Sequence, residues 1–174
     1  MDEFGLASVT PARAQVVKDF ATSELFDRTF QEGMELVEET AEYLDGAGRQ
    51  ESKLLSRAAA LAYASASMRL TTRLMQVASW LLVQRAVREG DMTPAEACQG
   101  RYRLNAKTRG EAADVELESL PTGLTGLADR AERLYERVAH LDRRMYLEAP
   151  GEEVPNAVLS QFERLRSAFG TASA

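Results

Sequence analysis

The segment from Gln50 to Arg88 constrains the fold more than any other part of the sequence, because it contains neither glycine nor proline. A helix rises about 1.5 Å per residue, so an unbroken helix here would span roughly 60 Å. Apolar and small residues recur along it in alternating steps of four and three, the spacing of helices that pack lengthwise. We therefore predict one long helix whose packing face is this heptad series: Leu54, Ala58, Leu61, Ser65, Met68, Thr72, Met75, Ser79, Leu82 and Ala86.

The same segment carries a second apolar stripe in its later half. At about 100° per residue, the stripe lies roughly 180–240° around the helix from Met68. A helix on the outside of a small bundle needs only one apolar face. Two interpretations remain open: the helix packs between two others of its own chain, or the second stripe is the face of a homodimer. Its residues are Leu70, Leu74, Val77 and Leu81.

Two further segments show the amphipathic helix pattern. The first runs from Ser23, a plausible N-cap, to Leu44, and it is strongly acidic, with Arg28 as its one basic residue. The other runs from Thr122 or Leu124 to Leu147. A capping box at Thr93-Pro94-Ala95-Glu96 predicts a short extra helix that reaches Tyr102 or Leu104. The sequence thus predicts an all-α fold, an antiparallel three-helix bundle with a short extra helix and flexible termini.

The pattern divides the chain into three parts. Residues 1–20 lack a clear pattern and are predicted to form an N-terminal arm, and residues 21–148 form the bundle domain. Pro150 and Gly151 interrupt the last long helix, which makes residues 149–174 a flexible C-terminal segment. Isolated apolar residues at helical spacing within it predict contacts with a partner: Phe162, Leu165 and Phe169.

Composition argues against several functions. The net charge of −6 disfavours nonspecific binding to nucleic acid or to an acidic membrane surface. Cys98 and His140 are the only residues of their types, so no disulfide within the chain and no zinc site is expected. No signal peptide or membrane-spanning stretch is evident. We expect a cytoplasmic protein that is not an enzyme, inserts in no membrane and needs no cofactor.

Arg69 and Arg73 lie four residues apart on one flank of the long helix, with Gln76 close by. One interpretation is that the arginines pair with the acidic first helix. The other is that the flank forms a strip that binds an anion or a peptide. The second interpretation supports an alternative function, in which a helical regulatory protein binds nucleic acid or a signalling partner through the Arg69/Arg73 flank.

Two long runs of residues resemble the RcdA family, the regulators of CtrA degradation. The denser run extends from Ser67 to Gln76 (SMRLTTRLMQ) and continues through ASWLL and QRA as far as Ala86. The earlier run includes EGMELVEE from Glu32 to Glu39, then YLDG and Gly48-Arg49. The resemblance is strong over residues 23–100 and weaker over residues 120–148.

The resemblance implies a function that periodicity alone does not. Proteins of this family are three-helix bundles that pair as homodimers and act as non-enzymatic adaptors for the protease ClpXP. They deliver cell-cycle substrates such as CtrA, together with CpdR and PopA, and they gather at a cell pole. The resemblance assigns no binding residue in this sequence, so the candidate positions above come from the pattern alone.

Overall fold

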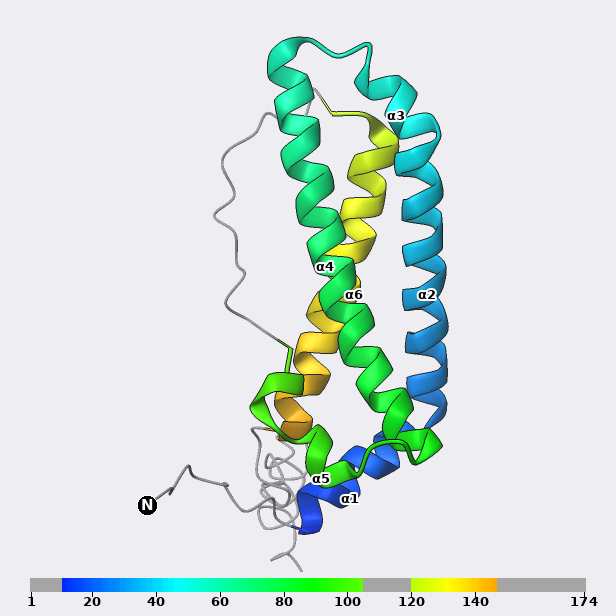
Figure 1. The fold of residues 1–174 in the computed structure, drawn as a ribbon, viewed down its shortest axis with the longest axis vertical. Coiled ribbons are helices and arrows are strands. Elements are labelled where there is room, and N and C mark those ends of the chain that lie inside the picture. Colours follow the sequence, from blue (N-terminus) through cyan, green and yellow to red (C-terminus); the bar gives the residue numbers. More distant parts are fainter. Residues whose placement is uncertain (1–10, 105–119, 147–174) are drawn as a thin grey trace, which may run out of the picture.

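The computed structural model describes residues 11–104 and 120–146, and within them every regular element is helical. Three long helices form a bundle: α2 (Glu24–Asp45), α4 (Arg57–Glu89) and α6 (Thr122–Tyr146) (Figure 1). The short elements are α1 (Pro11–Ala21), α3 (Ala47–Ser52), α5 (Pro94–Ala97) and the 3₁₀ turn η1 (Gly100–Tyr102). The prediction of an all-α three-helix bundle is confirmed.

Helix α2 begins where the sequence predicts. The Ser23 side chain accepts a hydrogen bond from the backbone N–H of Phe26, which satisfies one of the free donors at the helix start. The buried face of α2 contains Phe26, Leu36 and the small Gly33. A Cβ atom on Gly33 would lie 2.7 Å from Cδ1 of the fully buried Leu81, so the glycine permits the close approach of α2 to α4.

The prediction of one unbroken helix from Gln50 to Arg88 is wrong near its beginning. Helix α3 ends at Ser52, and α4 starts only at Arg57. Ser56 has an extended backbone, and its side chain accepts a hydrogen bond from the N–H of Ala59. A serine that caps a new helix competes with helix continuation, which explains why the chain turns here although it lacks glycine and proline.

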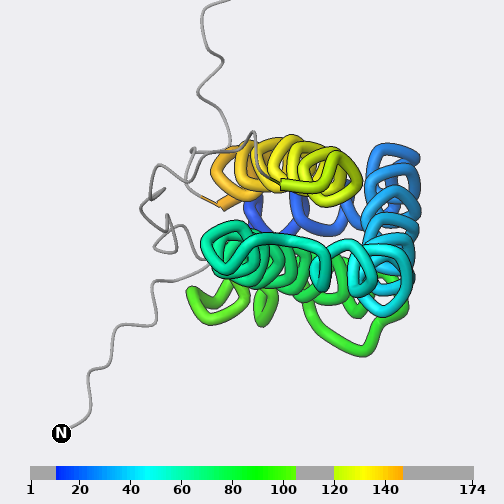
Figure 2. Tube along the Cα trace, turned by 90° about the horizontal axis from the view of Figure 1, so that it is seen from above, coloured from blue at the N-terminus to red at the C-terminus, as the bar shows by residue number. Residues whose placement is uncertain are grey.

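The long helices do not all alternate in direction. Helix α2 is antiparallel to both neighbours. Asp27 near its start pairs with Arg88 at the end of α4, and Glu39 near its end pairs with Arg130 in the first half of α6. Helices α4 and α6 run in the same direction, as the contacts Arg73–Glu132 and Trp80–Asp142 show. The view along the bundle shows the three helices at the corners of a triangle (Figure 2).

Helix α1 crosses the end of the bundle where α4 and α6 finish (Figure 1). Its Val17 and Ala21 are fully buried, and the ring of Phe20 lies 5.6 Å from that of Trp80. Residues 11–20 therefore form a helix packed on the core in a region where the sequence predicts an arm. The pattern is missed because α1 is short and buries few apolar side chains.

A buried polar cluster ties the segment after α4 to the bundle. Asp142 is 3% exposed and accepts hydrogen bonds from Trp80 Nε1, from the Arg103 guanidinium and from the backbone N–H of Leu104. The predicted capping box is present, with both the Thr93 and the Glu96 hydrogen bonds formed. The helix that it opens is only four residues long, and η1 follows it.

Candidate interaction surface

The second apolar stripe lies in the core of the chain. Leu70, Leu74, Val77 and Leu81 are each at most 4% exposed, and they form one cluster with side chains of α2 and α6. Burying a side chain of this size stabilises the fold by about 1.5–3 kcal/mol. The packing of the helix between two others of its own chain accounts for these residues, so they are not available as the face of a homodimer.

The heptad series, by contrast, faces solvent. Along α4 it lies on roughly the opposite side from the buried stripe, so the expectation that it packs against the rest of the chain is wrong. Its large members recur every seven residues and stay exposed: Leu54 is 88% exposed, Leu61 68%, Met68 72%, Met75 65% and Leu82 52%. The small members Ala58, Ser65, Thr72 and Ser79 between them are exposed as well. The part of the chain that the structure describes therefore carries a long, exposed apolar stripe along α4, with Leu54 just before the helix begins.

The arginine flank is only partly available. The Arg73 guanidinium bonds to Glu132 at 3.1 Å and lies 4.0 Å over the ring of Tyr135, so its side chain is held on α6. Its partner is thus on α6, whereas the sequence suggested the acidic α2. Gln76 accepts a long hydrogen bond of 3.5 Å from Arg73, and Arg69 is exposed. Arg69, Arg73 and Gln76 therefore do not form a strip that is free to bind an anion, because Arg73 is already paired with Glu132.

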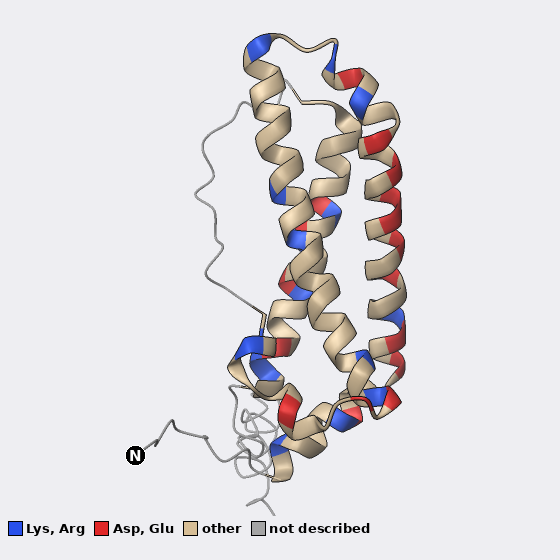
Figure 3. Cartoon of the chain, in the orientation of Figure 1, with Lys and Arg blue, Asp and Glu red and all other residues tan. Residues whose placement is uncertain are grey.

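The acidic face of α2 has its own partners. Figure 3 shows acidic residues following the outer side of α2 along its length. Among them, Glu32 pairs with Arg137 of α6, and Glu39 pairs with Arg130 of the same helix. These exposed pairs contribute at most about 1 kcal/mol each, so they help to set the register of α2 against α6 rather than the stability.

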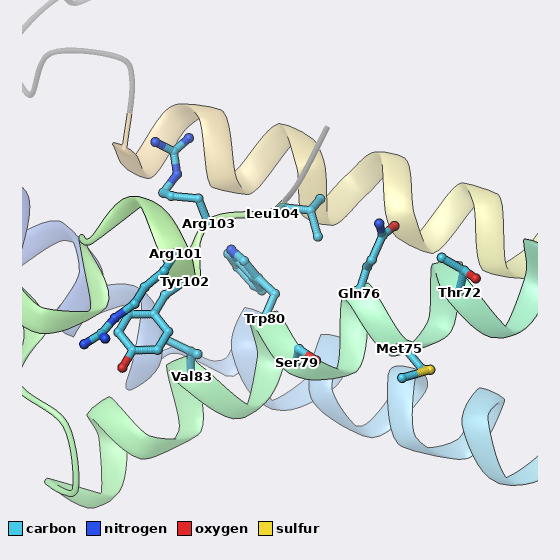
Figure 4. A pocket seen from close by; sticks show the side chains of 10 residues that line it. All are labelled: Thr72, Met75, Gln76, Ser79, Trp80, Val83, Arg101, Tyr102, Arg103 and Leu104. Atoms are coloured by element: carbon cyan, nitrogen blue, oxygen red, sulfur yellow. The ribbon is translucent and has the colours of Figure 1, made fainter. Parts of the chain in front are cut away.

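A pocket of about 450 Å³ opens beside the heptad series (Figure 4). One wall belongs to α4 and includes Met75, Trp80 and Val83. The other wall is the segment from Arg101 to Leu104, which Asp142 holds in place. The sequence pattern does not indicate this pocket, because it predicts a short helix that reaches Tyr102 or Leu104, whereas α5 ends at Ala97 and the residues after it turn back toward α4. The lining is completed by Thr72, Gln76 and Ser79.

The single histidine and the single cysteine do not lie together in one site. His140 is exposed on α6, and Cys98 is half-buried near α1, with a thiol pKa that burial raises. Within the described ranges, no group of three or more His, Cys, Asp or Glu side chains could hold a metal ion. No helix in those ranges is long and apolar enough to cross a membrane. Phe162, Leu165 and Phe169 lie outside the described residues, as does the whole segment 149–174.

The fold and its surface define a class: a helical-bundle protein whose described residues include an exposed apolar stripe along α4. The sequence matches, over residues 17–169, the family described as "Protein of unknown function (DUF1465)". It is also similar to a solved structure, RcdA from Caulobacter crescentus CB15, with 68% identity and a TM-score of 0.63. That match covers 76% of this chain and 99% of the RcdA chain. No curated protein matches the sequence. The chain belongs to the RcdA family.

Proposed function

We propose that this protein is a non-enzymatic adaptor that delivers cell-cycle regulators such as CtrA to the ClpXP protease, with CpdR and PopA as partners. Membership of the RcdA family supports the adaptor role. An adaptor requires a rigid scaffold with exposed binding faces, because it acts by raising the concentration of a substrate near the protease. The same resemblance motivates a cytoplasmic location with concentration at a cell pole.

The observation that carries the proposal is the exposed heptad series of α4. Contiguous apolar patches on soluble proteins commonly mark interaction sites, because exposing them to water is unfavourable. The large members at Leu61, Met68 and Met75 alternate with small members at Ser65 and Thr72. Two copies related by a two-fold axis could therefore fit the large side chains of one over the small positions of the other. We propose that the heptad series pairs the protein as a homodimer.

The alternative function, binding of nucleic acid through the Arg69/Arg73 flank, receives less support. Arg73 is occupied by Glu132 and Tyr135, so it would have to leave two partners to contact a phosphate. The net charge of −6 also opposes such binding. A strong fall of DNA affinity with rising salt would favour this alternative over the adaptor.

The adaptor role is tested with purified components. CtrA, ClpXP, CpdR and PopA are incubated with ATP and cyclic di-GMP, and the loss of CtrA is followed on gels with and without this protein. We expect faster loss of CtrA when the protein is present, and no loss without ClpXP. Equal rates with and without the protein would contradict the proposal.

The dimer is tested by light scattering after size-exclusion chromatography. Leu61→Glu combined with Met68→Glu places two charges on the heptad series, and we expect a monomer that keeps its helical bundle, because both side chains are exposed. Its thermal stability should fall only by the contribution of association, and it should no longer depend on protein concentration. The control is Glu38→Lys on the exposed face of α2, which should stay dimeric. A double variant that keeps the mass of a dimer would exclude the heptad series as the interface.

The C-terminal segment remains a candidate for partner binding. Its role is tested by deleting residues 151–174 and by replacing Phe162, Leu165 and Phe169 with serine in the full chain. We expect both changes to slow CtrA degradation while the bundle keeps its thermal stability. Unchanged substrate delivery and unchanged association with the protease would rule out the segment as a binding element.

A further inference from the structure

The residues that line the pocket between α4 and the segment Arg101–Leu104 indicate the chemistry of the ligand that it binds. Its floor is apolar, with the buried Trp80 and the exposed Met75, and Val83 and Leu104 are at its sides. Among the described residues that line it, the only charged ones are Arg101 and Arg103, and none is acidic. A positive, apolar pocket on a protein of net charge −6 favours a ligand that is both acidic and apolar.

The two arginines are in different situations. The Arg103 guanidinium is neutralised by Asp142 at 2.8 Å and stacks over Tyr146. Arg101 lies 4.7 Å from the centre of the Tyr102 ring and, within the described part of the chain, has no carboxylate at ion-pair distance. In Figure 4, Arg101 and Tyr102 lie together at the end of the pocket beside Val83. The exposed Glu96 interacts electrostatically with Arg101 but forms no ion pair with it, so Arg101 is a cation at the rim of an apolar site.

The wall that carries Arg101 is held in position by buried contacts. Asp142 bonds to both Arg103 and the backbone of Leu104, and it also accepts from Trp80, which forms the floor. The two walls are therefore fixed to the same buried carboxylate. A site whose walls are positioned in this way loses little entropy when a ligand binds.

We propose that this pocket binds a segment of a partner protein in which an acidic residue lies next to a large apolar one. The apolar side chain packs on Val83 at the edge of the buried Trp80, and the carboxylate pairs with Arg101. The inference goes beyond the proposed function, because such a segment would bind whether or not the protein serves a protease. The pocket adjoins the heptad series through Thr72, Met75 and Ser79, and the ligand contacts named here lie outside the series.

The first test identifies what the pocket binds without assuming a partner. A phage-displayed library of random dodecapeptides is selected on the immobilised full chain, and the same selection is made on Arg101→Glu. We expect the full chain to enrich peptides that combine acidic and large apolar residues, and the variant to lose this enrichment. Enrichment of basic or uncharged peptides, or none at all, would overturn the proposal.

The second test places the selected peptide in the pocket. Trp80 is the only tryptophan of the chain, so a tryptophan-free peptide that covers it should change its fluorescence. A fluorescein-labelled copy, followed by anisotropy, should bind at least tenfold more weakly to Arg101→Glu and within about threefold of normal to Arg101→Lys, which keeps the charge. A peptide that binds Arg101→Glu as tightly as the unmodified chain lies elsewhere, and this result would refute the assignment.

The matched control is Arg57→Glu, which makes the same charge change at the far, exposed end of α4. It should leave the affinity of the peptide unchanged. Circular dichroism and thermal unfolding of each variant verify that the bundle is intact. Equal losses of affinity in Arg57→Glu and Arg101→Glu would show attraction to overall charge rather than binding in the pocket.

Discussion

The indole Nε1 of Trp80 donates a hydrogen bond of 3.0 Å to the carboxylate of Asp142, and both residues are at most 3% exposed. The same carboxylate receives the Arg103 guanidinium and the backbone N–H of Leu104. A buried charge is tolerated when hydrogen bonds and an opposite charge compensate its loss of hydration. Asp142 therefore links α4, α6 and the segment after α5 at a single point.

Replacing Asp142 with alanine should destabilise the fold strongly. The change leaves the buried N–H groups of Trp80 and Leu104 without an acceptor and removes the ion-pair partner of the partly exposed Arg103, and we expect a loss of about 3–5 kcal/mol in the free energy of unfolding. Urea denaturation measures the loss. The exposed control Glu38→Ala should change stability by less than about 0.5 kcal/mol, and a similarly small effect of Asp142→Ala would show that the cluster is dispensable.

The stability of the protein should fall in alkaline solution because of Tyr146. Burial raises the pKa of its hydroxyl from 10.0 to about 12. The unfolded chain loses this proton at a lower pH than the folded chain does. The contribution of Tyr146 to stability is therefore fully present below pH 10 and is lost as the pH rises toward 12. A pKa raised from 10.0 to about 12 corresponds to a contribution of about 3 kcal/mol to the free energy of unfolding.

The measurement for Tyr146 is urea unfolding over a pH series from about 9 to 12. The control is Tyr146→Phe, which removes the hydroxyl that accepts a hydrogen bond from Gln84. This variant should be less stable by about 1–3 kcal/mol near neutral pH, and its stability should fall less steeply above pH 10. Parallel curves for the two proteins would contradict the titration of Tyr146.

Two glycines in long helices should respond to alanine in opposite ways. At Gly33, the new Cβ would meet Cδ1 of the buried Leu81 at 2.7 Å, and we expect a net loss of about 1 kcal/mol after the gain in helix propensity. At Gly126 of α6, nothing lies within 4 Å, so alanine should stabilise by about 0.5–1 kcal/mol. Thermal unfolding compares them, and stabilisation by both substitutions would disprove the close packing at Gly33.

The break before α4 depends on the Ser56 cap. Ser56→Ala removes the acceptor for the N–H of Ala59 and should cost about 1 kcal/mol, whereas Ser56→Asp keeps an acceptor and should cost little. Chemical denaturation distinguishes the two variants. An alanine variant of normal stability would mean that the helix start is fixed by packing alone.

The sequence predicted the helices better than their orientation. The first and last long helices lie where the sequence predicts them, with Ser23 as the N-cap of α2 and Thr122 as the first residue of α6. Periodicity succeeds for these two helices because each has one apolar face. Helix α4 has two, and regular spacing could not tell which one is buried. The volume of the side chains offered a signal, since the buried face combines leucines with Trp80 while the heptad series alternates with serine, threonine and alanine.

The pocket was hidden for a different reason. Its walls join α4 to residues 18 to 32 positions further along, and their contact depends on Asp142, which comes from a third segment. No local sequence pattern predicts a contact between three segments so far apart in the chain. A single buried acid within the otherwise apolar and basic end of α6 was the one available hint, and its partners could be identified only in three dimensions.

The parallel alignment of α4 and α6 has a consequence for the route of folding. Its contacts join residues that are 59 to 62 positions apart, whereas a bundle of strictly alternating helices is built from closer neighbours. Contacts of such separation form slowly, because a long loop must close before they contribute. We expect α2 and α4 to associate first as a hairpin, and α6 to dock along α4 in a later, rate-limiting step.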